Sequence, residues 1–279
     1  MDMGIELAPG GKQGLVVANP VLLAGGVIGY GELVPRGLDL AQVGAAVIGP
    51  FTATPRAGRA APRYGVGPGG MVVDAGGQSR GVGAVAAKFA KHWWRLGCPV
   101  IAQVVAESAR ETEKIVARLQ ETEGIVGLEL VPATTDLATA RGMVAAALAA
   151  GDRPVWVKLR LDVAVAWAGE LVGTGAQGIV VGQPPRGCLP GPRGDLVAGE
   201  LYGPLVFALM LDVLVATGRQ ELPAALIACG GIHTVAQMET ALAAGAQAVQ
   251  IDSALWVEPG LPNRLAAAWA VRATGAGVG

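Results

Sequence analysis

The stretch AGAQAVQIDSALW, Ala244 to Trp256, contains the pattern on which the predicted fold depends. Its apolar run Ala248–Ile251 follows a glycine that can end a helix, and this order predicts a buried strand after a helix. In α/β barrels such a strand often ends at a phosphate site that is built from small residues and backbone N–H groups. Here the first residue past the run is Asp252, an anion at the place of a phosphate. The stretch therefore predicts a barrel strand and raises the question of what its end can bind.

Short apolar runs of this kind recur along the chain, as expected for strands that are covered on both faces. The predicted strands are Val21–Ala24, Ala45–Ile48, Pro99–Val104, Gly127–Val131, Pro154–Leu159, Gln177–Val181, Ala225–Cys229 and Ala248–Ile251. Amphipathic patterns between them predict helices, with Ser108 and Thr234 as N-caps. This alternation favours a closed (β/α)8 TIM barrel of the α/β class, with an open doubly wound sheet as the alternative.

The organisation of the chain predicts one domain. No linker divides the sequence, so residues 1–279 are expected to form a single barrel. Two long segments interrupt the rhythm, Pro50–Gly83 after the second strand and Gly182–Gly203 after the sixth. Both follow the carboxyl ends of strands, where barrel enzymes place their active sites, so we expect ordered functional loops there.

The composition limits the partners of the protein. A formal net charge of −1 gives no electrostatic argument for binding nucleic acid or an anionic membrane. No run of eighteen apolar residues occurs, so a membrane span is not expected. Three widely spaced cysteines suit a reducing cytosol, and His92 and His233 complete no zinc pattern with them. We therefore predict a cytoplasmic protein with a small-molecule ligand and no metal.

The order and spacing of several segments are similar to a known family. Two of them are NPVLLAGGVIGYGE, Asn19 to Glu32, and TATPRAGRAAPRYGVGPGGMVVDAGGQSRGV, Thr52 to Val82. Farther along the chain come CPVIAQV, GLELV, PVWVKL, YGP, ACGGI and GAQAVQIDSALW. Together they resemble the dihydroorotate dehydrogenases, FMN-dependent barrels that oxidise dihydroorotate to orotate. The similarity spans roughly Ala18 to Trp256.

The resemblance implies a set of FMN-binding positions. Lys158, at the end of the fifth predicted strand, would contact the flavin ring, and an ion pair with Glu129 is the alternative. Gly230 and Gly231 would offer backbone N–H groups to the phosphate, and a tight turn is the alternative. The other positions that the resemblance places at the cofactor are Ala24, Gly25, Gly203 and Ser253.

One of these positions departs from the family pattern. The family's phosphate loop begins with Gly-Thr or a close variant, whereas this chain has Asp252 and Ser253. A carboxylate beside a phosphate dianion is unfavourable when both are charged and partly buried, although Ser253 can still donate a hydrogen bond. The sequence therefore predicts a weakened FMN site.

The substrate side departs further. Where the family has a lysine and asparagines that hold the pyrimidine, this chain has Gly49, Val73, Ser79 and Val131. The family's base falls near Thr134, which is the candidate catalytic residue. Thr135 or Asp136 can instead be the N-cap of a helix over 137–150. We therefore expect no oxidation of dihydroorotate.

Two functions remain in competition. The first is an FMN-type oxidoreductase that acts on the CH–CH group of a changed substrate. Arg186 and Arg193 would clamp an anionic substrate from a stiff loop, with a solvated surface loop as the alternative, and Gln103 would also contact it. The second is a non-catalytic barrel that has lost flavin and serves as a partner subunit or binds another ligand. A barrel enzyme for another phosphate ligand is a third possibility. For the first function, further candidates for contacts to the changed substrate are Gln183, Asp74 and Tyr202.

Two apolar features suggest a homodimer. The segment Leu201–Gly218 predicts an apolar helix, and Trp93 and Trp94 are adjacent aromatic residues. The members of the resembling family are commonly dimeric. These residues can also belong to the core of a single barrel.

Overall fold

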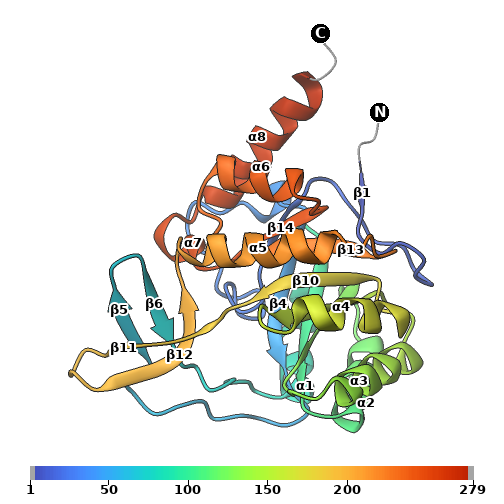
Figure 1. Ribbon diagram of the computed structural model, residues 1–279. Coiled ribbons are helices and arrows are strands. Elements are labelled where there is room, and N and C mark those ends of the chain that lie inside the picture. Colours follow the sequence, from blue (N-terminus) through green and yellow to red (C-terminus); the bar gives the residue numbers. More distant parts are fainter. Residues whose placement is uncertain (1–3, 276–279) are drawn as a thin grey trace.

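The computed structural model describes residues 4–275 and contains a closed barrel of parallel strands in the order β10-β13-β14-β3-β4-β7-β8-β9 (Figure 1). The barrel strands are β3 (Val21–Leu23), β4 (Ala45–Phe51), β7 (Val100–Ala106), β8 (Gly127–Pro132), β9 (Val155–Arg160), β10 (Gly178–Gln183), β13 (Ala225–Cys229) and β14 (Ala248–Ile251). Each corresponds to one predicted strand. The predicted (β/α)8 TIM barrel is confirmed.

Helices cover the outside of the barrel. They are the 3-10 helix η1 (Leu40–Gln42) and α1 (Val82–Trp93), α2 (Ala109–Gln120), α3 (Leu137–Ala150), α4 (Ala164–Gly173), α5 (Val206–Gly218), α6 (Val235–Ala243), α7 (Ala254–Val257) and α8 (Leu261–Gly275). Ser108 and Thr234 are N-caps as predicted, because their side chains accept hydrogen bonds from the backbone N–H groups of Glu111 and Gln237. Within residues 4–275, no helix has the length and apolar character needed to cross a membrane.

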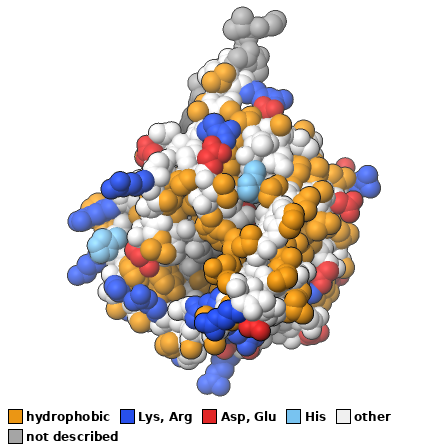
Figure 2. All heavy atoms as spheres, turned by 90° about the vertical axis from the view of Figure 1, so that its left-hand side faces the viewer, with side chains coloured by type: hydrophobic (Ala, Val, Ile, Leu, Met, Phe, Trp, Pro, Cys, Tyr) orange, Lys and Arg blue, Asp and Glu red, His pale blue; other side chains and the backbone are white. Residues whose placement is uncertain are grey.

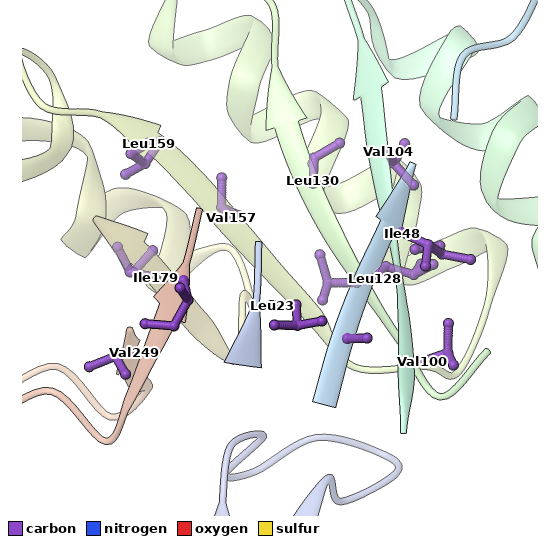
Figure 3. Packing of buried hydrophobic residues seen from close by; sticks show 14 of the residues in the cluster. Leu23, Ile48, Val100, Val104, Leu128, Leu130, Val157, Leu159, Ile179 and Val249 are labelled. Atoms are coloured by element: carbon purple, nitrogen blue, oxygen red, sulfur yellow. The ribbon is translucent and has the colours of Figure 1, made fainter. Parts of the chain in front are cut away.

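Alternation along each strand separates two sets of side chains. In β9, Val155, Val157 and Leu159 belong to the large hydrophobic cluster between barrel and helices, whereas Trp156 belongs to the smaller cluster inside the barrel. Figure 3 shows the outer set, with Val157 and Leu159 among its labelled residues. Burying one such side chain contributes about 1.5–3 kcal/mol, so this layer holds the helices on the barrel. The same alternation points Lys158 inward.

The amino-terminal end of the barrel is covered by a short hairpin. Strands β1 (Ile5–Glu6) and β2 (Val16–Val17) pair antiparallel, and Leu7 beside them is completely buried in the inner cluster. The indole Nε1 of Trp156 donates a hydrogen bond to the Leu7 carbonyl at 2.6 Å. This contact fixes the hairpin across the floor, opposite the end at which a ligand site is expected.

The two predicted long segments each contain a hairpin that the sequence analysis did not predict. Their strands are β5 (Tyr64–Gly67), β6 (Gly70–Val73), β11 (Arg186–Pro190) and β12 (Leu196–Tyr202). The strands form one antiparallel sheet in the order β11-β12-β6-β5, which projects from the barrel at the left of Figure 1. Pairing of β12 with β6 joins the two segments, so they form one structured wall.

The predicted apolar helix over 201–218 is shorter than expected. Leu201 and Tyr202 belong to β12, and α5 begins at Val206, since the chain turns at the Gly203-Pro204 pair. The two tryptophans also separate. Trp93 is buried and its indole donates to the Tyr30 carbonyl at 2.8 Å, whereas Trp94 is 63% exposed.

Candidate functional site

A cavity of about 800 Å³ opens at the carboxyl ends of the barrel strands, beside the antiparallel sheet. This volume is typical of sites for small molecules. The same side of the molecule in Figure 2 shows a broad hydrophobic area with Lys and Arg side chains along its edges. The predicted site residues that line the cavity are Ala24, Gly25, Gln103, Lys158 and Arg186, and the further candidates that line it are Asp74, Gln183 and Tyr202.

A buried polar network lies at the bottom of the cavity, with the fully buried Glu129 at its centre. The Glu129 carboxylate accepts hydrogen bonds from Gln103 Nε2 at 2.9 Å and from Gln250 Nε2 at 2.5 Å. Lys158 Nζ lies 3.7 Å from Glu129 Oε1 and donates to Gln250 Oε1 at 2.9 Å. Burying a carboxylate requires such partners, because desolvation of an unpaired charge is very unfavourable. The network therefore binds both oxygens of the Glu129 carboxylate and both ends of the Gln250 amide.

Lys158 has the ion-pair partner that the sequence offered as one alternative. Its ammonium carries three N–H donors and bonds Gln250 Oε1, while Glu129 lies at ion-pair distance and the Cys229 thiol is a further hydrogen-bond partner. The flavin contact of Lys158 stays a prediction. Sequence reasoning missed Gln250, for which the available signal was one amide side chain in the otherwise apolar strand β14.

The protonation states at the bottom of the cavity follow from burial and neighbouring charges. Burial disfavours the Lys158 ammonium, but Cys229, Glu129 and Asp252 outweigh it and raise the pKa of Lys158. Burial raises the pKa of the Cys229 thiol to about 12, against the opposing effect of Lys158. Lys158 is therefore charged near neutral pH, whereas the Cys229 thiol stays protonated and is a poor nucleophile.

Asp252 places a second carboxylate in the cavity. It follows β14, is only 6% exposed, and accepts a hydrogen bond from Ser253 Oγ at 3.1 Å. Burial raises the pKa of Asp252, while Lys158 opposes the shift. Ser253 is buried and is not among the residues that line the cavity, so its predicted contact to a cofactor stays a prediction.

The glycines predicted at the cofactor, Gly203, Gly230 and Gly231, have close packing partners and do not line the cavity. Gly231 has φ +68°, and a Cβ there would lie 2.2 Å from the Phe207 backbone nitrogen. Gly203 has φ +132°, and a Cβ there would lie 2.5 Å from the Gly69 carbonyl oxygen. Gly230 is covered by Val206 at the start of α5. Packing therefore requires glycine at these positions, and their contacts to a cofactor stay predictions.

Two aromatic side chains line the cavity near Asp252. The rings of Tyr202 and Trp256 have centroids 5.2 Å apart. Tyr202 donates its hydroxyl to Glu200 Oε2 at 2.7 Å, and burial, with Glu200 and Asp252, raises its pKa well above the ordinary value. The phenol is therefore uncharged and already bonded, and this wall is apolar.

Thr134, the catalytic candidate, does not line the cavity. Its hydroxyl accepts a hydrogen bond from the Asp136 backbone at 3.1 Å. Asp136 is the N-cap of α3 and accepts from the Thr139 backbone at 2.8 Å, which confirms that alternative for the loop. The catalytic role of Thr134 stays a prediction.

The two arginines predicted as a clamp occupy different places. Arg186 lines the cavity at the start of β11, where it pairs in register with Glu200 of β12. Arg193 is exposed in the turn that connects β11 to β12, outside the cavity lining. The structure therefore brings only Arg186 to the cavity, and the substrate role of Arg193 stays a prediction.

The positions at which the sequence predicts a departure from the family pattern on the substrate side all line the cavity, and they are Gly49, Val73, Ser79 and Val131. Among these four residues, Ser79 has a hydroxyl group, which donates a hydrogen bond to the Pro50 carbonyl at 2.9 Å. Its oxygen also lies 3.3 Å from the Tyr30 hydroxyl. This part of the wall therefore offers a ligand no side-chain ammonium or amide.

Fold and cavity together define a (β/α)8 barrel with its ligand site at the carboxyl ends of the strands. The family model described as dihydroorotate dehydrogenase matches residues 12–267. The chain belongs to the dihydroorotate dehydrogenase family, a family of flavoprotein oxidoreductases, as the resemblance predicted.

Individual relatives agree with this assignment. The chain is 30% identical to the catalytic subunit of dihydroorotate dehydrogenase B (NAD(+)) from Pelobacter propionicus, over 95% of this chain and 91% of the relative. It is 32% identical to the protein of the same name from Desulforudis audaxviator, over 91% and 88% of the two chains. The crystal structure of the Eimeria tenella dihydroorotate dehydrogenase with ferulenol has a TM-score of 0.78 at 18% identity and covers 95% of this chain and 84% of its own. That structure supports the fold.

FMN joins a planar ring to a phosphate dianion, and the residues of the cavity fit only the ring. At the ring end, Lys158 offers a donor, and the Gln103 amide lies against Gly25 as a flat polar surface. Asp252 supplies a carboxylate to the same cavity and interacts electrostatically with Lys158. Two like unit charges about 4 Å apart repel by about 4 kcal/mol at an effective dielectric constant of about 20. The phosphate of the predicted FMN does not fit beside this carboxylate.

Proposed function

We propose that this chain binds a planar heterocycle of flavin-ring size in its cavity and does not oxidise dihydroorotate. The observation that carries the proposal is the fixed polar pair Lys158 and Gln103 at the bottom of the cavity. Lys158 lines the cavity as a positively charged donor, and Gln103 Nε2 donates to Glu129, which leaves Gln103 Oε1 as an acceptor. A ring edge with a carbonyl next to an N–H complements a donor next to an acceptor.

The substrate site supports the second part of the proposal. Dihydroorotate carries a carboxylate and several amide groups, which require polar partners in a closed site. Gly49, Val73 and Val131 present no hydrogen-bonding side chain, and Ser79 is bonded to the backbone. Each unmet polar group costs about 1–3 kcal/mol, so the combined loss opposes binding of this substrate.

An activity assay tests the second part. Purified protein is supplied with dihydroorotate and an electron acceptor, and the relative from Pelobacter propionicus serves as the positive control. The expected result is turnover for the relative and none for this chain, with or without added FMN. Turnover comparable to that of the relative would contradict the proposal.

A binding assay tests the first part, with riboflavin as the probe because it contains the flavin ring without phosphate. Quenching of riboflavin fluorescence is expected with the wild-type protein and should be lost in Lys158→Met, since the ring carbonyl loses its donor. Arg193→Ala, outside the cavity lining, is the matched control and should bind as the wild type does. Equal binding by all three proteins would contradict a site at Lys158.

The assembly state and location remain proposals. Leu205, the N-cap of α5, and Leu209 within α5 are 68% and 51% exposed, which supports the predicted homodimer because a second copy would cover them. Size-exclusion chromatography at the mass of one chain would contradict it. The predicted cytoplasmic location rests on the cysteine pattern alone.

A further inference from the structure

We infer that Asp252 makes the cavity select an unphosphorylated ligand, one that presents an N–H group or a positive charge to this carboxylate. The inference rests on the proposed function, because it specifies the ligand of the same cavity.

The charges at the bottom of the cavity are unbalanced. Lys158 supplies one positive charge, and its ammonium is already held by Glu129 at 3.7 Å and by Gln250 at 2.9 Å. Asp252 adds a second carboxylate. In residues 4–275, no lysine, arginine or histidine nitrogen lies within 4.0 Å of it. Arg56, Arg59, Arg80 and Arg186 line other parts of the same cavity. An anion that enters beside Asp252 is therefore repelled by this carboxylate, whereas a cation or an N–H donor is attracted.

The hydroxyl groups near Asp252 are already bonded. The Ser253 hydroxyl donates to Asp252, and Tyr202 donates its hydroxyl to Glu200. Burial raises the pKa of Asp252, and the hydrogen bonds from Ser253 oppose the shift. His233 remains neutral near pH 7, because burial lowers its pKa despite the nearby Asp252, and its Nε2 has no hydrogen-bond partner in the described part of the chain. The two hydroxyl groups therefore leave no donor for phosphate oxygens, and His233 brings no positive charge.

The turn after the seventh strand is closely packed. Phosphate sites in barrels use exposed N–H groups of the turn after the seventh strand. Here that turn contains Gly230 and Gly231, and the start of α5 packs on it so closely that a Cβ on Gly231 would overlap Phe207. The aromatic pair Tyr202 and Trp256 forms the remaining wall, and its π faces favour a cation or a heterocycle.

A comparison of riboflavin with FMN tests the inference, because the two probes share one ring and differ only in the phosphate. Dissociation constants are measured for both by fluorescence quenching at neutral pH and low salt. The wild type is expected to bind riboflavin at least about tenfold more tightly than FMN. Asp252→Asn should remove most of this difference by improving FMN affinity while leaving riboflavin affinity nearly unchanged.

Asp152→Asn is the matched control. Asp152 is a carboxylate outside the cavity lining, and it lies 2.6 Å from Lys12 and is already paired. This variant should keep the wild-type preference for riboflavin. A second variant, Asp252→Gly, tests the same charge if the asparagine variant does not fold.

The outcomes separate the two proposals. FMN affinity equal to or better than riboflavin affinity in the wild type would overturn the inference about Asp252 and leave the ring site intact. The same preference in Asp252→Asn as in the wild type would also overturn it. If neither wild type nor variant binds riboflavin, the ring site itself is wrong, and both proposals fail.

Discussion

The Lys158 ammonium lies 3.7 Å from the Glu129 carboxylate inside the barrel, with 6% and 0% of the two side chains exposed. The two buried ions stabilise each other, because either one alone would be buried without a compensating charge. Gln250 and Gln103 complete its hydrogen bonds from two other strands. The ion pair holds the side chains at the bottom of the cavity in place. The Glu129 carboxylate compensates much of the positive charge of Lys158.

Removal of one partner should therefore destabilise the barrel. Glu129→Gln leaves the Lys158 ammonium uncompensated and is expected to cost about 3–5 kcal/mol in the free energy of unfolding, measured by urea denaturation. The double variant Glu129→Gln with Lys158→Met should recover part of this loss. The exposed pair Arg118–Glu121 gives the control, since Glu121→Gln should cost less than about 1 kcal/mol. Equal costs at the two sites would contradict the network.

Gly231 should tolerate no side chain, because its packing requires glycine. Gly231→Ala combines a φ of +68° with a Cβ placed 2.2 Å from the Phe207 nitrogen. We expect a loss of at least about 2 kcal/mol in the free energy of unfolding. Gly83→Ala in α1 is the control, since its Cβ meets nothing within 4 Å and alanine favours helices. If Gly231→Ala left the free energy of unfolding unchanged, this result would contradict the close packing of α5 on the turn.

Asp252 should make stability depend on pH. Burial raises its folded pKa above the unfolded value, so the folded protein binds the proton more tightly. Its contribution to stability is complete below the unfolded pKa and is lost as pH rises through the folded pKa. The wild type should therefore match Asp252→Asn near about pH 4 and become less stable than the variant toward neutral pH.

Melting temperatures of both proteins across this range check the prediction. Lys158, Cys229, Tyr202 and His233 also act on Asp252 or respond to it, and they are common to the two proteins. The difference between the melting curves therefore isolates Asp252. A wild type that gains stability over the variant as pH rises would reverse the sign and contradict a carboxyl group with a raised pKa.

The cap of α3 offers a test of the loop that was expected to hold the catalytic base. Thr134→Val removes the hydroxyl that accepts from Asp136 and should lower stability only slightly. It should leave riboflavin binding unchanged, because Thr134 does not line the cavity. If Thr134→Val lost riboflavin binding to the same extent as Lys158→Met, Thr134 would contribute to the ligand site.

The barrel could be predicted from the sequence because each of its strands is buried on both faces and appears as a short apolar run. The antiparallel sheet could not. Its strands are rich in glycine and largely exposed, and its central pairing joins Tyr202 to Met71 across a long stretch of chain. Such pairing depends on the tertiary fold and leaves no local pattern.

The site was predicted in part. Lys158 followed from the family resemblance, and Arg186 and Gln103 were candidates for substrate contacts, and the structure has all three at the cavity. The partner of Lys158 could not be chosen, because Gln250 reaches it across the barrel from β14. Gly230 and Gly231 matched a phosphate turn by spacing, but the helix that covers them follows from the path of the chain after β12.

The most direct test of the account is mass spectrometry, with an absorbance spectrum, of the small molecule that accompanies the freshly purified protein. The account predicts no FMN, and any molecule released from the cavity should be a heterocycle without phosphate. Release of FMN in a ratio near one per chain from the wild-type protein would contradict it.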